Sequence, residues 1–84
     1  MKRQEIENLV KEIIKDYLGE IEYAQCGEIT GQSNLKSIGI DSFGFLYLIW
    51  EIEGKFKIQV SRKDEKAMET IDGIVDIVYN KINC

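Results

Sequence analysis

The chain has 84 residues, 44% of them hydrophobic, and carries a formal net charge of −4 at pH 7. A chain of this length builds one small core and leaves too little material for the walls of a deep, water-excluding catalytic pocket. The acidic balance also disfavours nucleic acid as a partner, because neutralising phosphates takes clustered Lys and Arg.

Side chains that commonly carry catalysis or bind metals are scarce. Histidine, the commonest general base and metal ligand, is absent. The two cysteines, Cys26 and Cys84, lie too far apart to form a metal-binding motif, and free thiols fit a reducing compartment. Cys26 is expected in a loop and Cys84 at a frayed end. No apolar run approaches the roughly 20 residues of a membrane span, and no signal peptide is recognisable. We therefore expect a cytoplasmic protein without a metal site.

The first predicted element is an amphipathic helix over residues 3–18, which Gly19 would end in a left-handed conformation. Its apolar stripe consists of Ile6, Leu9, Val10, Ile13, Ile14, Tyr17 and Leu18. Residues 19–41 are then expected to form a long connection, a feature that usually has a function in so small a domain. Three residues of this connection, Leu35, Ile38 and Ile40, are spaced to pack inward.

A second helix is predicted over residues 42–56, opened by Asp41 and Ser42, either of which is able to cap it. At about 100° per residue its apolar side chains form two stripes on nearly opposite sides. The core stripe consists of Phe45, Leu48, Ile49, Ile52 and Phe56. The second stripe consists of Phe43, Leu46, Tyr47, Trp50 and Gly54. Two interpretations stay open: the helix is buried on all sides, or the second stripe is exposed and docks a partner.

Two further helices complete the predicted fold. Ser61 and Asp64 are spaced as a capping box for a short helix near 62–68. Thr70 suits the cap of a last helix that reaches about Ile82. The sequence therefore predicts an all-α fold, a small four-helix bundle of three long helices and one short helix, with a long loop between the first two.

The segment that precedes and opens the second helix, Ile38-Gly39-Ile40-Asp41-Ser42-Phe43, resembles the attachment motif of acyl carrier proteins. That motif usually reads leucine, glycine, any residue, aspartate, serine, leucine. The similarity extends over roughly residues 6–82, because the spacing from Ser42 to Phe56, Val60, Met68 and Ile71 matches the family's core positions. Residues 1–84 are accordingly expected to be a single carrier domain.

The resemblance implies a function. A phosphopantetheinyl transferase would attach 4′-phosphopantetheine from coenzyme A to Ser42, and Asp41 would help that transferase recognise the carrier. The thiol of this arm would hold acyl intermediates as thioesters for loading, synthase and transferase enzymes of fatty-acid, polyketide or related biosynthesis. The carrier supplies no acid, base or oxyanion hole of its own, so it would not be an enzyme. Taken alone, Ser42 is also interpretable as an ordinary helix cap.

Departures from the family pattern narrow this expectation. Fatty-acid carriers commonly present acidic or polar groups where this chain has Gly44, Tyr47 and Gly54. This difference favours a free-standing, specialised, monomeric carrier that partners recognise through apolar contacts with Phe43, Leu46, Tyr47 and Trp50. Bulky Phe45, Ile49 and Phe56 further predict limited room for a long acyl chain.

Alternatives to an acyl carrier remain. The segment Asp41-Ser42-Phe43-Gly44 also resembles D-alanyl carrier proteins, so an aminoacyl or peptidyl carrier is one alternative. The other is a helical interaction module that is never modified.

Overall fold

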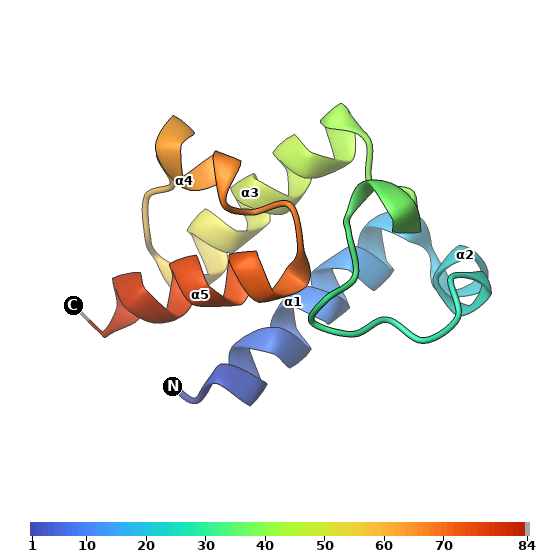
Figure 1. Cartoon of the computed structure of the whole chain (residues 1–84), viewed down its shortest axis with the longest axis horizontal. Helices are drawn as coiled ribbons and strands as arrows, with labels where there is room; N and C mark the ends of the chain where they lie inside the picture. The colour runs from blue at the N-terminus through green and yellow to red at the C-terminus, as the bar shows by residue number, and fades with distance from the viewer. Residues whose placement is uncertain (84) are drawn as a thin grey trace.

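The computed structural model describes residues 1–83, and Cys84, with the expectation attached to it, lies outside the described residues. The described chain forms five α-helices and one short 3-10 helix. In chain order they are α1 (Arg3–Leu18), α2 (Glu20–Gln25), η1 (Lys36–Ile38), α3 (Ser42–Phe56), α4 (Arg62–Lys66) and α5 (Ile71–Ile82). Figure 1 shows the three long helices, α1, α3 and α5, as the body of a small all-α bundle, which confirms the predicted fold class.

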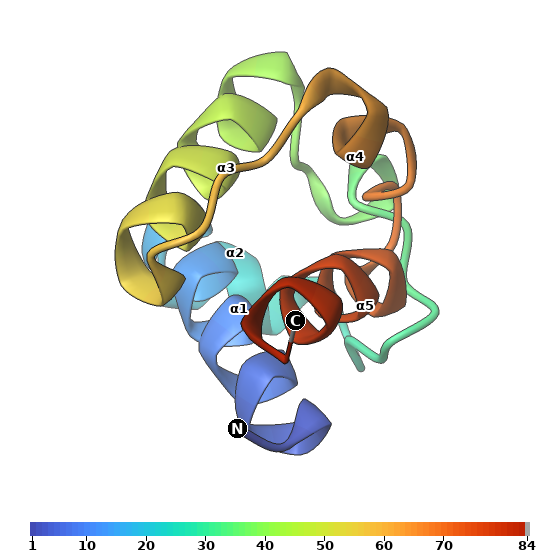
Figure 2. The same cartoon turned by 90° about the vertical axis from the view of Figure 1, so that its left-hand side faces the viewer.

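The core lies where the apolar faces of the three long helices meet. Helix α1 packs against both α5 and α3, and Figure 2 shows the three helices grouped. The fully buried side chains are supplied mainly by these helices, and they are Ile6, Val10, Ile14, Leu48, Ile52, Met68, Ile71, Ile74, Val75 and Val78. Spacings of three and four residues put them on one side of each helix, so burial of these stripes stabilises the bundle.

The predicted helix boundaries agree closely with the observed ones. Helices α1 and α3 begin and end where the pattern placed them, and α4 ends two residues early, at Lys66. The capping box of α4 is present, because Ser61 Oγ accepts from the Asp64 N–H at 3.2 Å and Asp64 Oδ2 accepts from the Ser61 N–H at 3.0 Å. Thr70 caps α5 by accepting from the Gly73 N–H at 3.1 Å. No helix within residues 1–83 is long and apolar enough to cross a membrane.

The long connection contains more structure than the sequence indicated. Residues 20–25 form α2, so the expectation of an unbroken loop over 19–41 is wrong. Gly19 has φ +89° and ψ +156°, a positive φ but not the left-handed helical conformation that was expected. Cys26 lies at the end of α2, half-buried, and its thiol contacts the Ile38 carbonyl oxygen at 3.4 Å. The region is therefore a short helix followed by a loop.

The loop after α2 is fastened to the beginning of α5. The first amides of a helix have no partner within the helix. Here the Ile71 N–H donates to the Ser33 carbonyl at 3.3 Å and the Asp72 N–H donates to the Gly31 carbonyl at 2.7 Å. Figures 1 and 2 both show this loop running beside the start of α5. As predicted, its inward side chains are buried, and they are Leu35, Ile38 and Ile40. The loop therefore holds the entrance of α3 in place.

Candidate functional site

The chain turns sharply just before α3. Gly39 adopts φ +97° and ψ +13°, a left-handed conformation that side chains other than glycine rarely adopt. The Gly39 N–H donates to the Lys36 carbonyl and the Ile40 N–H donates to the Leu35 carbonyl, at 3.2 and 2.9 Å. This turn keeps Ile40 in the core and brings the following residues to the surface.

Asp41 is the residue that caps α3. Its Oδ1 accepts a hydrogen bond from the Gly44 N–H at 2.8 Å, and its carbonyl accepts from the Phe45 N–H at 2.8 Å. Ser42 is the first residue of the helix, so its interpretation as the cap is wrong. Ser42 is exposed, and within residues 1–83 no hydrogen bond engages its hydroxyl. The local fold therefore makes no use of this side chain.

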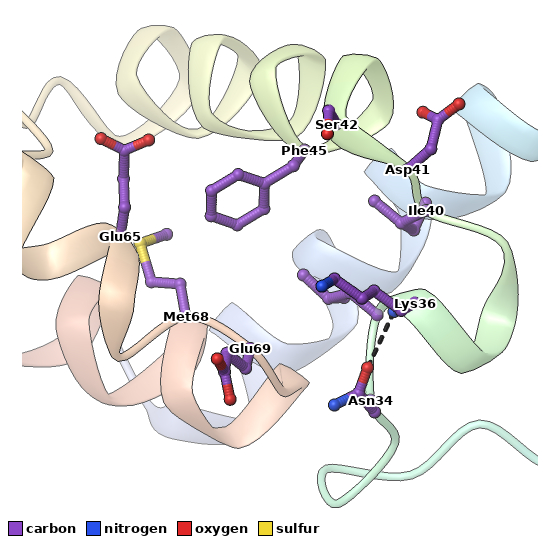
Figure 3. A pocket seen from close by; sticks show the side chains of 10 residues that line it. Asn34, Lys36, Ile40, Asp41, Ser42, Phe45, Glu65, Met68 and Glu69 are labelled. Atoms are coloured by element: carbon purple, nitrogen blue, oxygen red, sulfur yellow. Dashed lines mark hydrogen bonds between the residues drawn. The ribbon is translucent and has the colours of Figure 1, made fainter.

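A pocket of about 460 Å³ opens beside Ser42. It lies between the start of α3, the loop around η1 and the segment from α4 to α5. Its lining consists of Asn34, Leu35, Lys36, Ile40, Asp41, Ser42, Phe45, Glu65, Met68 and Glu69. Figure 3 shows the Phe45 ring extending from α3 into the space that Met68 and Glu65 border on the other side. Phe45 is half-buried: it packs against the core, as its stripe predicted, and also forms a wall of this pocket.

The second stripe of α3 is largely exposed. Phe43 is 79% exposed, Leu46 59% and Trp50 70%. The interpretation of α3 as buried on all sides is therefore wrong. Tyr47 differs from the other members, because it is half-buried and its ring packs against Tyr17, with centroids 5.4 Å apart. The exposed apolar surface of α3, which we call the α3 face, consists of Phe43, Leu46 and Trp50, with Tyr47 at its edge.

Tyr17, from the last turn of α1, is part of the site. Its hydroxyl donates to Asp41 Oδ1 at 3.3 Å, and its ring covers Gly44 so closely that a Cβ there would lie 2.8 Å from Tyr17 Cε2. Partial burial raises the pKa of Tyr17, and the charge of Asp41 and their hydrogen bond raise it further, so the hydroxyl stays protonated at neutral pH. The spacing of α1 assigned Tyr17 to the core stripe, and that assignment is wrong, because the side chain is 37% exposed.

The arrangement suits a covalent attachment point. The hydroxyl of Ser42 is exposed, carries no structural hydrogen bond and stands at the positive end of a 15-residue helix. An anionic phosphodiester is favoured at such a position, where first-turn amides are free of helical partners. The site lies next to a partly apolar pocket, so an attached arm has both solvent and a sheltered surface within reach.

Comparison with known proteins agrees with this geometry. A family model described as a phosphopantetheine attachment site matches residues 8–78. Nodulation protein F of Rhizobium leguminosarum bv. viciae is 31% identical over 74 residues, which are 88% of this chain and 80% of that protein. Nodulation protein F of Rhizobium leguminosarum bv. trifolii is 31% identical over 55 residues, 66% of this chain and 60% of that protein. The chain therefore belongs to the acyl carrier protein family, whose members covalently bind 4′-phosphopantetheine.

Proposed function

We propose that this protein carries acyl groups as thioesters on a 4′-phosphopantetheine arm attached to Ser42, and delivers them to enzymes of fatty-acid, polyketide or related biosynthesis. The observation that supports Ser42 as the attachment residue is that its hydroxyl is exposed and makes no hydrogen bond within the described residues. Asp41 provides the cap of α3, and the Ser42 hydroxyl faces solvent at the first turn of the helix. The arm supplies the thiol chemistry, while this chain positions the arm and presents a surface to the enzymes.

The attachment reaction balances as a simple phosphoryl transfer. Ser42 Oγ forms a bond to the phosphorus that carries the pantetheine, and the pyrophosphate bond of coenzyme A breaks. The adenosine bisphosphate leaves, and the hydroxyl proton passes to a base of the transferase or to solvent. In this chain Ser42 follows the capping residue Asp41 and belongs to the first turn of α3.

The direct test is modification in vitro. The protein is incubated with coenzyme A, Mg²⁺ and a phosphopantetheinyl transferase of broad specificity, and its intact mass is measured. We expect a gain of one phosphopantetheinyl group that Ser42→Ala abolishes. Ser37→Ala is the matched control, because Ser37 is also exposed and lies only five positions away, in η1. Absence of any mass gain in the wild type would favour the alternative, a helical interaction module.

The α3 face is proposed as the docking surface for the loading and receiving enzymes. It adjoins Ser42, so an enzyme that binds it finds the arm at the edge of the contact. Exposed aromatic residues are the side chains that most often anchor protein interfaces. The Glu53 carboxylate of α3 is already engaged within the chain, because its Oε2 accepts the Val60 N–H at 3.0 Å. We therefore expect contacts with this face to be mainly apolar.

Trp50→Glu tests the docking surface. Because Trp50 is 70% exposed, the substitution leaves folding within about 0.5 kcal/mol of the wild type and abolishes loading by the cognate enzyme. Ile21→Glu is the control, since Ile21 is 76% exposed but belongs to α2 and is not part of the α3 face. If Trp50→Glu is loaded as well as the wild type, the α3 face is not the docking surface for the loading enzyme.

An aminoacyl carrier is a second candidate, which the charges around the pocket favour. Glu65 and Glu69 line it together with a single cation, Lys36, whereas the Asp41 carboxylate points away from the pocket. Carboxylates attract the ammonium group of an aminoacyl thioester and repel a carboxylated cargo. Competition between an acyl and an aminoacyl loading enzyme for the modified carrier separates the two. If the aminoacyl loading enzyme loads the carrier preferentially, the protein is an aminoacyl carrier.

The remaining expectations stay predictions. We propose that residues 1–84 work as one monomeric carrier domain in the cytoplasm, with no catalysis of their own. Light scattering on the purified modified protein reports the mass in solution.

The cargo is the subject of a second prediction. Phe45 narrows the pocket beside Ser42, so we do not expect a long acyl chain to be sheltered there. A solution structure of a long-chain acyl form tests this directly.

A further inference from the structure

Tyr17 connects two elements that are distant in sequence at the attachment site. It lies in the last turn of α1, and its hydroxyl reaches Asp41 across 24 positions of sequence. The ring packs closely over Gly44 and against the Tyr47 ring, both of which belong to α3. Three contacts therefore fix this side chain, and its one polar atom is directed at the residue that precedes Ser42.

The consequence for Asp41 follows from how its two oxygens are used. Oδ1 accepts both the Gly44 N–H at 2.8 Å and the Tyr17 hydroxyl at 3.3 Å. Within residues 1–83, Oδ2 has no hydrogen-bond partner, and Asp41 is exposed. Figure 3 shows the carboxylate pointing away from the pocket. Two donors from different elements restrict the rotation of the carboxylate more than the cap alone does, and they leave Oδ2 available to an approaching protein.

Gly44 makes this arrangement possible. A Cβ at position 44 would lie 2.8 Å from Tyr17 Cε2 and 3.0 Å from Cζ, too close for the ring to keep its place. Glycine inside a helix costs about 1 kcal/mol relative to alanine, and its φ here is an ordinary helical one. The glycine is thus required by the approach of Tyr17 and not by the backbone of α3.

We propose that Tyr17 is a positioning residue for the modification of Ser42: its hydroxyl orients the Asp41 carboxylate so that Oδ2 is presented to the transferase or to the metal ion which that enzyme holds. This inference rests on the proposed function, in which Ser42 is the attachment residue. Tyr17 itself does not touch the reacting atoms.

The test is a kinetic comparison of carriers as substrates of the transferase. Tyr17→Phe keeps the ring over Gly44 and removes only the hydroxyl. A hydrogen bond contributes enough to change binding by about threefold to tenfold, so the KM for the carrier should rise by about that factor while kcat stays within about twofold. Tyr79→Phe, on α5 and packed near Arg3, is the matched control and should leave both constants unchanged.

A double-mutant cycle shows whether the effect passes through Asp41. Asp41→Asn replaces the carboxylate with an amide that still caps α3 but has no charged oxygen to present. In that background Tyr17→Phe should change the KM by less than about twofold. An unchanged KM for the single variant, or an equal rise in both backgrounds, overturns the inference. Failure of the wild type to be modified at Ser42 instead overturns the proposed function, so the two failures are distinguishable.

Discussion

Substituting alanine for each of the two glycines inside α3 should change stability in opposite directions. Gly44 and Gly54 both have ordinary helical φ values, so alanine at either site gains about 1 kcal/mol from helix propensity. At Gly54 an added Cβ meets nothing within 4 Å. At Gly44 the same atom would lie 2.8 Å from Tyr17 Cε2 and 3.2 Å from Ile40 Cγ2.

Gly44→Ala costs free energy because the added Cβ displaces the Tyr17 ring from its present contacts. If the ring moves aside, it gives up its hydrogen bond to Asp41, about 0.5–1.5 kcal/mol, and its packing on Tyr47, about 0.5–1.5 kcal/mol. Against this loss of about 1–3 kcal/mol stands the propensity gain of about 1 kcal/mol. Gly44→Ala should therefore destabilise the fold by about 1 kcal/mol, whereas Gly54→Ala should stabilise it by about 1 kcal/mol.

The assay is denaturant unfolding followed by circular dichroism, with free energies extrapolated linearly to water. The two variants should differ by about 2 kcal/mol, or roughly 10 °C in Tm for a domain of this size. In a Tyr17→Ala background the main obstacle is gone, and Gly44→Ala should no longer destabilise. If Gly44→Ala stabilises the wild-type chain as much as Gly54→Ala does, the Tyr17 ring does not pack over Gly44.

Three further predictions concern the scaffold. Ile52→Ala removes a fully buried side chain and should cost about 2–5 kcal/mol of unfolding free energy, whereas Ile21→Ala, at a 76% exposed position, should stay within about 0.5 kcal/mol in the same denaturant titration. Ser61→Ala removes the cap of α4 and should cost about 1 kcal/mol; a value near zero would mean that α4 forms without its cap. The hydrogen bond from the Ser61 N–H and the contact with Lys81 lower the pKa of Asp64 to about 2. The contribution of Asp64 to the free energy of unfolding is therefore complete above the ordinary aspartate pKa of 3.8 and is lost as the pH falls toward 2. Acid unfolding curves of Asp64→Asn and wild type should converge over that interval.

The helices that have a buried apolar stripe and a clear capping residue were predictable from sequence. Helix α2, which has neither, was not. Helix α5 begins after Thr70 and buries four side chains at helical spacing, so pattern and cap agree. Helix α2 has six residues, no buried side chain and no side-chain cap, and Ile21 within it is 76% exposed. Nothing in a window of that length separates it from a loop, because a helix so short depends on what surrounds it.

The site was predictable only where it depends on neighbours in sequence. The turn at Gly39, the cap before Ser42 and the two stripes of α3 all arise within a few positions of chain. The roles of Tyr17 and Tyr47 do not, because helical spacing assigns one to the core and the other to an exposed stripe. In the structure they pack on each other, since the end of α1 passes over the first turn of α3. Such a contact depends on the relative placement of two helices, which no local pattern reports.

The order of Asp41 and Ser42 has a consequence for the modified protein. A serine that capped α3 would supply the acceptor for a first-turn amide, and converting its hydroxyl to a phosphodiester would disturb a contact of about 1 kcal/mol. Here the cap belongs to Asp41, whose Oδ1 accepts the Gly44 N–H, and the Ser42 hydroxyl makes no hydrogen bond within the described residues. An arm attached to Ser42 would therefore remove no hydrogen bond at the start of α3. If Ser42 carries the arm, as proposed, the first turn of α3 should be the same before and after modification, and the α3 face beside it should keep its shape.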